Sequence, residues 1–196
     1  MTGNGPVRVD TEQMPALGHR SVLDRPKLGV LSSVRCPGSV ILALYDLARS
    51  LRDSGLTFVG GFQSPVERDF LDILLRGSPR VIICPARGIA RMRVRDEWRK
   101  PLAEGRLLFL SPFQDSERRP RRGMAQRRNE LVAALADRVL IGHAAPGGAT
   151  DRLARQLLGD GKPVFTIDDP ANAALLALGA VPATAKAISE DSLGRE

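Results

Sequence analysis

The residues of this sequence with the clearest chemical meaning are arginines that lead into a predicted helix. A polar loop carries four of them within five residues: Arg118, Arg119, Arg121 and Arg122. The motif Arg127-Arg128-Asn129 follows shortly after this loop. Arg127 and Arg128 fall in the first turn of the predicted helix, where the dipole disfavours each positive charge by about 0.3–1 kcal/mol. Because guanidinium groups match phosphate oxygens in charge and geometry, we interpret the cluster as a phosphate-binding feature. A solvated, mobile loop is the alternative.

A glycine turn further along the chain is the second candidate anion site. The apolar run Arg138–Ile141 is typical of a buried parallel strand, and helical spacing resumes from Ala149 to Leu158. Between them lies Pro146-Gly147-Gly148, whose residue types permit a tight turn with positive φ. Unpaired backbone N–H groups and the positive end of a helix favour anions at such a turn, so phosphate binding is predicted here too.

Two earlier loops have comparable residues. Ser33 and Arg35 follow a short apolar run, and Gly60-Gly61 follows the next one. A Ser-rich helix cap with Arg35 in solvent is the alternative for the first loop, and close packing of a neighbouring helix is the alternative for the glycines. Ser64 and Glu67 have the spacing of a capping box, which we favour over a catalytic pair.

The elements that position these loops follow from the hydrophobic pattern. Six short apolar runs alternate with helical segments: 27–31, 56–59, 80–84, 106–110, 138–141 and 163–167. This alternation predicts an α/β fold, a doubly wound and mainly parallel sheet of about six strands with helices on both faces. Because ligands bind outside the carboxyl ends of parallel strands, the loops should meet along one rim. Residues 1–26 are predicted as an extended arm, 27–180 as the Rossmann-like domain and 181–196 as a short tail.

Composition sets the partner class and the compartment. Lys and Arg total 29 against 22 Asp and Glu, a net charge of +7 that favours a polyanionic partner. Alternatively, the positive charge reflects an arginine-rich composition, with the arginines spread over solvent-exposed faces. No apolar run is long enough to span a membrane, so a cytoplasmic location without membrane contact is predicted. Trp98 is predicted to be a packing anchor rather than a base-stacking platform, because a core usually claims the few aromatic residues of a chain.

A metal or cofactor is not predicted. Cys36, Cys84 and His143 each follow a predicted strand at the presumed ligand edge, but no CxxC or HxxxH spacing supports a zinc site.

The order of these motifs resembles the Rossmann-like core of the DprA/Smf DNA-processing proteins, over about residues 27–180. The most specific likeness is Arg128-Asn129 with the apolar helix that follows, which is similar to the Arg-Asn-Arg motif of that family. Ser33 and Arg35 resemble its Gly-Ser-Arg loop, and Gly60-Gly61 its Ser-Gly-x-Ala-x-Gly loop. Two departures are a glutamate, Glu130, in place of the second arginine, and Ser32 in place of the first glycine.

The resemblance implies that single-stranded DNA binds in a basic pocket at the carboxyl edge of the sheet, without catalytic turnover. It also implies a RecA-type recombinase as a partner, and leaves a homodimer open. The helical N-terminal and winged-helix C-terminal domains of many family members are not expected in a chain of 196 residues.

A second hypothesis comes from the wider SLOG superfamily, which includes LOG-type nucleotide phosphoribohydrolases and nucleotide-sensing domains. The active LOG pattern has a glutamate three residues after a threonine, whereas Leu153 stands three residues after Thr150. No general acid or base is evident without that carboxylate, so an enzyme is disfavoured. A mononucleotide-binding sensor or a LOG-like nucleotide phosphoribohydrolase remains the alternative.

Overall fold

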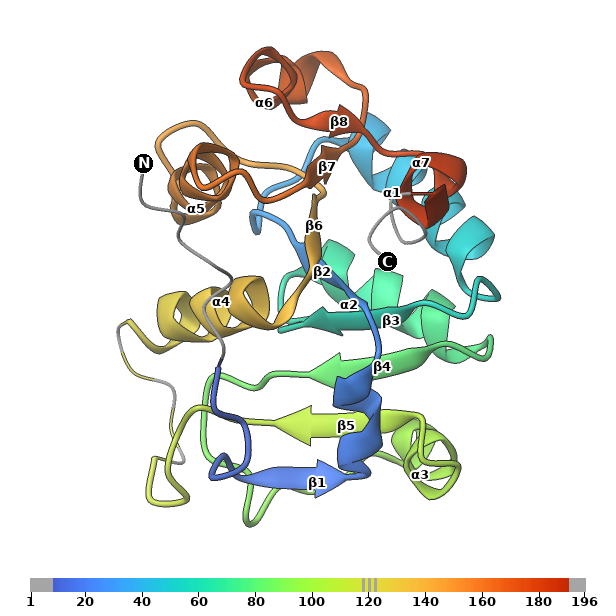
Figure 1. The fold of residues 1–196 in the computed structure, drawn as a ribbon, viewed down its shortest axis with the longest axis vertical. Coiled ribbons are helices and arrows are strands. Elements are labelled where there is room, and N and C mark those ends of the chain that lie inside the picture. The colour runs from blue at the N-terminus through green and yellow to red at the C-terminus, as the bar shows by residue number, and fades with distance from the viewer. Residues whose placement is uncertain (1–8, 118, 120, 122, 191–196) are drawn as a thin grey trace.

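The computed structural model describes residues 9–117, 119, 121 and 123–190, which form one eight-stranded sheet (Figure 1). The strand order is β1-β5-β4-β3-β2-β6-β7-β8. All six predicted strands are present and run parallel to one another: β2 (Lys27–Leu31), β3 (Thr57–Gly60), β4 (Arg80–Ile83), β5 (Leu107–Leu110), β6 (Arg138–Ile141) and β7 (Val164–Thr166). The predicted doubly wound α/β class is therefore confirmed.

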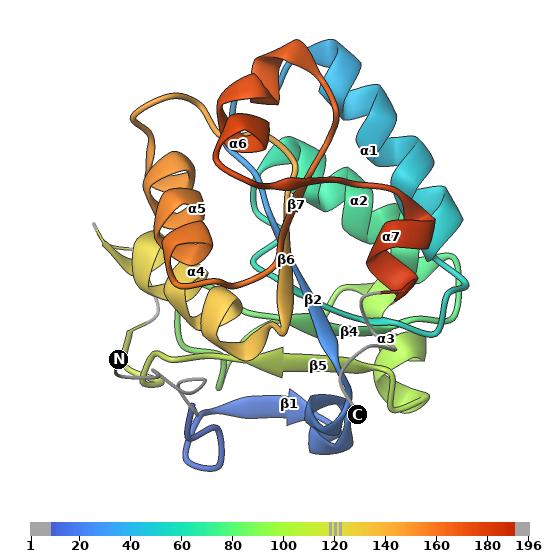
Figure 2. The same ribbon diagram turned by 45° about the horizontal axis from the view of Figure 1, so that its top comes forward.

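Helices cover both faces of this sheet (Figure 2). One face packs against α1 (Gly38–Leu51), α2 (Pro65–Leu75), α3 (Asp96–Ala103) and α7 (Ala185–Glu190). The other packs against α4 (Met124–Leu135), α5 (Ala149–Gly159), α6 (Ala173–Ala177) and the 3-10 helix η1 (Arg20–Asp24). A second 3-10 helix, η2 (Pro170–Asn172), leads into α6. Strands with buried residues on both sides explain why their sequences are continuously apolar.

The sheet has two more strands than the approximate count from the sequence, and both lie in segments predicted as an arm or a tail. β1 (Ala16–Gly18) pairs antiparallel with β5, and β8 (Val181–Pro182) pairs parallel with β7. Val22 of η1 and Ile188 of α7 are fully buried. These segments, predicted as parts of an arm and a tail, thus pack with the sheet. Strands of two or three residues are too short to show a hydrophobic period, and only pairing with a neighbour stabilises them.

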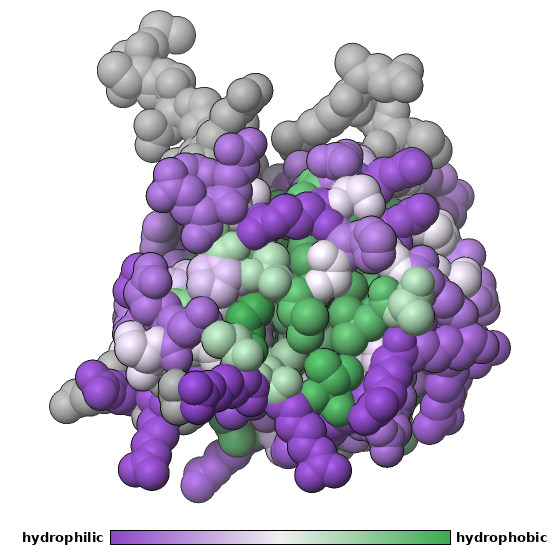
Figure 3. All heavy atoms as spheres, turned by 90° about the horizontal axis from the view of Figure 1, so that it is seen from below, coloured by the Kyte–Doolittle hydropathy of each residue, from purple (hydrophilic) through white to green (hydrophobic). Residues whose placement is uncertain are grey.

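The β1 edge carries apolar surface. Seen from this side, hydrophobic side chains gather in the middle of the face and polar ones surround them (Figure 3). Leu17 of β1 is 39% exposed. A three-residue edge strand covers β5 only in part, which leaves some apolar surface at this end of the sheet. Within the described part of the chain, none of the helices has the length and hydrophobicity needed to cross a bilayer.

The α2 helix confirms the predicted capping box. The Ser64 side chain accepts a hydrogen bond from the Glu67 N–H at 3.3 Å, and the Glu67 carboxylate accepts one from the Ser64 N–H. Phe70 is 1% exposed, and its ring lies edge-on to Phe58 with 6.3 Å between centroids. The cap starts the helix in the register that turns Phe70 into the core.

We expect Phe70→Ala to lower the free energy of unfolding by roughly 3–5 kcal/mol, because it removes a buried ring and leaves a cavity. Leu42→Ala is the matched control, since Leu42 in α1 is 66% exposed, and it should change stability by less than about 0.5 kcal/mol. Denaturant unfolding measures both. Equal midpoints for the two variants would show that the face assignment of α2 is wrong.

Candidate functional site

The candidate site is the edge where the parallel strands end. The chain runs from β2 through β3 and β4 to β5, and then returns to place β6 on the other side of β2. This reversal between β2 and β6 is a topological switch point, where the loops after neighbouring strands diverge and leave room for ligands. The predicted loops after β2, β3 and β6 all start from this edge.

The loops after β2 and β6 are joined by hydrogen bonds through Ser33. Its N–H donates to the His143 carbonyl at 2.8 Å, and its Oγ accepts from the Ala145 N–H at 2.9 Å. The structure therefore brings Ser33 next to the segment that continues into Pro146, as the sequence predicted. Arg35 lies in the same loop as Ser33 and is exposed.

The loops after β2 and β3 are joined by Glu67, which is 5% exposed. Its carboxylate accepts backbone hydrogen bonds from Ser32 at 2.8 Å, Gln63 at 3.0 Å and Ser64 at 3.3 Å. Charge-assisted bonds of this kind are stronger than neutral ones. Glu67 therefore acts both as the partner in the helix cap and as the connection between two loops of the site.

Arg128 lies behind the β3 loop, where it is 5% exposed. Its guanidinium fills the space beside Gly61, so that a side-chain carbon at position 61 would overlap it. Burial lowers the pKa of Arg128, while the nearby Glu67 and Cys84 act in the opposite direction. Its Nε and Nη1 atoms are buried and have no hydrogen-bond partner within the described part of the chain. A buried cation with unused donors is costly, and a bound anion would reduce that cost.

The β3 loop also contains a strained residue. Phe62 has a φ of 48°, in the left-handed region that residues other than glycine rarely adopt, and it is 5% exposed. A side chain at Gly60 would come within about 3 Å of the Phe62 ring. Such strain costs on the order of 1–3 kcal/mol and concentrates at functional sites. Gly60 and Gly61 thus make room for two large side chains of the protein itself.

The glycine turn after β6 differs from the prediction of unpaired amides. The Gly147 N–H donates to Asp151 Oδ2 at 3.0 Å, and the Gly148 N–H donates to the Ala145 carbonyl at 2.9 Å. Burial of Asp151 opposes its ionisation, but the bond from Gly147 and the ion pair with Arg155 outweigh this and lower its pKa. The chain's own carboxylate in the first turn of α5 therefore occupies the position predicted for phosphate at Gly147. Pro146 is exposed beside this turn.

The arginine cluster before α4 is partly described. Arg119 and Arg121 are exposed, whereas Arg118 and Arg122 lie outside the described residues. The guanidinium of Arg127 lies 5.5 Å from the centroid of the Phe113 ring, so α4 and the preceding segment contact one another. Asn129, the next residue after Arg128, is partly buried, and its Oδ1 atom has no partner among the residues described.

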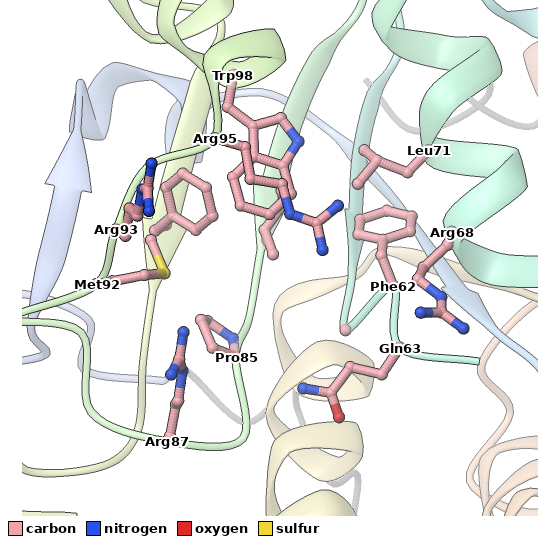
Figure 4. Close-up of a pocket in the computed structure, with 13 residues that line it drawn as sticks. Phe62, Gln63, Arg68, Leu71, Pro85, Arg87, Met92, Arg93, Arg95 and Trp98 are labelled. Carbon is pink, nitrogen blue, oxygen red and sulfur yellow. The ribbon is translucent and has the colours of Figure 1, made fainter. Parts of the chain in front are cut away.

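A pocket that the sequence did not predict opens beside the β3 loop (Figure 4). It has a volume of about 390 Å³ and lies between α2 and the segment that leads into α3. Its apolar wall is formed by the aromatic and sulfur-containing side chains of Phe62, Met92, Trp98 and Phe109. Four arginines surround it: Arg68, Arg87, Arg93 and Arg95. These residues come from four separate segments of the chain, so no local sequence motif predicts the pocket.

Comparisons with known proteins fit this geometry. A scan against protein-family models and a search of curated proteins found no match. Among solved structures, DNA processing protein A (DprA) of Helicobacter pylori matches with a TM-score of 0.75 at 21% identity, covering 95% of this chain and 89% of that chain. DprA of Streptococcus pneumoniae matches with a TM-score of 0.72 at 19% identity, covering 92% of this chain and 65% of that chain.

The chain has the fold of the DprA proteins. The resemblance predicted from the sequence is confirmed at this level. The same architecture also occurs in the molybdenum cofactor carrier protein of Chlamydomonas reinhardtii, at a TM-score of 0.61 and 15% identity, covering 87% of this chain and all of that chain. The structure described for the H. pylori protein concerns a mode of single-stranded DNA binding.

The DprA fold brings together much of the predicted site. Ser33, Arg35, Gly61 and Arg128 belong to the same edge of the sheet, although Arg128 is buried and Arg35 is exposed. Burial raises the pKa of the Cys84 thiol to about 12, with Arg128 acting in the opposite direction. Over the described ranges, no three His, Cys, Asp or Glu residues are grouped closely enough to hold a metal ion.

The packing of Gly61 on Arg128 in this DprA fold leads to a stability prediction. Gly61→Ala should lower the free energy of unfolding by about 1–3 kcal/mol, because the new carbon overlaps the guanidinium. The same change in an Arg128→Ala background should cost much less, since the overlap is gone. Denaturant unfolding of the four proteins gives the coupling energy.

Gly38→Ala is the control, because nothing lies within 4 Å of a side-chain carbon at that position in α1. It should leave stability unchanged or slightly raised. If Gly61→Ala cost as much without Arg128 as with it, the proposed contact would be refuted.

Proposed function

We propose that this protein binds single-stranded DNA through its phosphates along the C-terminal edge of the sheet, without chemical turnover. The observation that carries the proposal is the buried Arg128 guanidinium, with unused donors, at the switch-point edge of a DprA fold. A phosphate near this group would supply the negative charge that the described protein surroundings provide only in part.

Exposed cations on the loops at this edge of the sheet extend the site. Arg35 on the β2 loop and Arg127 on α4 are both exposed, and so are Arg119 and Arg121 before α4. Ser33 Oγ accepts one hydrogen bond and keeps its own hydrogen available for a phosphate oxygen. Several cations spaced along one edge suit a chain of phosphates better than a single anion.

The proposal includes no reaction. Leu153 occupies the position of the LOG-type glutamate, and no carboxylate lines the pocket within the described residues. A bound strand held this way would be available for transfer to another protein. A RecA-type recombinase is the recipient that the resemblance implies, and retention of the protein by immobilised recombinase–DNA filaments would test that extension.

The direct test is binding of fluorescent oligo-dT across a salt series. We expect measurable affinity at low salt, and a logarithmic salt dependence of about −0.7 per phosphate contacted on a single strand. Arg35→Ala should weaken binding and reduce the slope by about 0.7, because one phosphate contact is lost. A melting screen with mononucleotides run in parallel tests the sensor alternative, which predicts thermal stabilisation by the ligand and little salt dependence.

Arg76→Ala is the matched control. Arg76 is exposed at the C-terminal end of α2, and therefore lies at the opposite edge of the sheet. Its replacement by alanine removes the same charge as Arg35→Ala. It should leave both affinity and slope unchanged. Undetectable oligo-dT binding at low salt, or equal effects of the two variants, would contradict the proposed edge.

A further inference from the structure

We infer that the pocket between α2 and α3 holds one unstacked base of the bound DNA strand, stacked on the guanidinium of Arg95. This inference rests on the proposed function and assigns a separate subsite to it. The phosphates of the strand lie along the edge, and one base turns into the pocket that Phe62, Arg95 and Trp98 help to line, called here the arginine–aromatic pocket.

The shape and lining of the pocket suit a planar, aromatic ligand. Its volume of about 390 Å³ lies within the range of small-molecule sites. Trp98 and Phe109 form one wall, with ring centroids 5.2 Å apart, and Phe62 faces them from the β3 loop (Figure 4). Ring faces flanked by guanidinium groups are what an unstacked base needs.

Arg95 supplies the stacking surface. Its guanidinium carbon lies 4.8 Å from the centroid of the Trp98 ring, and its side chain reaches across the pocket toward Phe62 (Figure 4). Guanidinium planes stack on bases as aromatic rings do. Among the described residues, Arg95 forms an ion pair with Glu97 at 3.5 Å. Both side chains are more than half exposed, so the pair holds Arg95 weakly.

Trp98 has a second unusual feature. Its indole Nε1 is buried and has no hydrogen-bond partner within the described residues. A buried donor without a partner is unfavourable, and a base carries acceptors on its edge. A small shift of Arg95 would give such an acceptor access to this N–H group.

The charges around the pocket select a polyanion. Arg68, Arg87 and Arg93 line it from different sides, and no ion pair to any of the three occurs among the residues that the structure describes. An uncharged apolar ligand would leave these cations without partners, and an inorganic anion would not use the rings. A base with its flanking phosphates uses both.

The pocket is also continuous with the DNA edge. Gly61, Phe62 and Gln63 line the pocket, while the Gln63 N–H donates to Glu67 and Gly61 packs on Arg128. The β3 loop therefore has the edge on one side and the pocket on the other. A strand that crosses this loop can reach both.

Because Trp98 is the only tryptophan of the chain, its fluorescence reports directly on this pocket. We would titrate the protein with oligo-dT and with an oligonucleotide of equal length and charge in which every site is abasic. The inference predicts that oligo-dT changes the Trp98 emission and binds roughly 5- to 100-fold more tightly than the abasic strand. If both strands bind equally and leave the emission unchanged, the base pocket is wrong while phosphate binding stands. If neither strand binds, both proposals fail.

A variant pair on the same segment sharpens the test. Arg95→Ala should weaken oligo-dT binding by several fold more than it weakens binding of the abasic strand, because stacking is lost as well as charge. Arg99→Ala is the matched control, since Arg99 lies on α3 outside the pocket, is exposed and pairs with Asp96 at 2.9 Å. Equal weakening of both strands by Arg95→Ala would reduce Arg95 to a phosphate contact and overturn its stacking role.

Free dTMP distinguishes a base in a strand from a free nucleotide. We expect dTMP to change the Trp98 emission only at concentrations far above those of the oligonucleotide, because it lacks the phosphate contacts at the edge. If dTMP binds as tightly as oligo-dT and produces the same emission change, the pocket is a mononucleotide site and the assignment to a strand is overturned.

Discussion

Three backbone N–H groups at the functional edge converge on one buried carboxylate, that of Glu67. They come from the loops after β2 and β3, which are separated by the whole of α1 along the chain. Pairing within the sheet does not by itself fix the distance between two loops that leave neighbouring parallel strands. Glu67 fixes it from within the cap of α2, and its negative charge acts on Arg128, which lies behind the same loop. The site geometry therefore depends on a residue that never needs to contact a ligand.

The edge is assembled at a cost in stability. Phe62 adopts a positive φ, Arg128 keeps a largely buried charge, and Trp98 has a buried N–H group without a partner among the described residues. Each feature is unfavourable in isolation, and all three lie on or next to the loops at the ends of β3 and β4. A core optimised only for packing would have replaced them. Their concentration at one edge is what a ligand-binding region of a marginally stable protein is expected to show.

The fold alone leaves the ligand open, because the same architecture occurs in DprA proteins and, more distantly, in a molybdenum cofactor carrier protein. The side chains at the C-terminal edge of the sheet, not the fold, determine which ligand binds. In the proposed function, the exposed Arg35 and Arg127 supply charge for a polyanion along the edge, whereas the pocket combines arginines with aromatic rings. A linear ligand with alternating charged and aromatic parts matches both regions. This match links the loops near the switch point to the cavity beyond β3.

The sequence by itself determined the order of the elements, because buried parallel strands need continuous apolar runs and helices need one apolar stripe. It also identified the Ser64–Glu67 cap, whose partners lie three residues apart, and the nearness of Ser33 to the β6 loop, which follows from parallel strands ending at one edge. Only the tertiary structure decided that Gly147 donates to Asp151, that Arg128 is buried against Gly61, and that Glu67 reaches Ser32. It also placed Trp98 and Phe62, assigned to packing or to no role, in one pocket with four arginines. The physical reason is distance along the chain: periodicity and caps act over a few residues, whereas these contacts join segments whose relative placement is set by sheet order and side-chain volume.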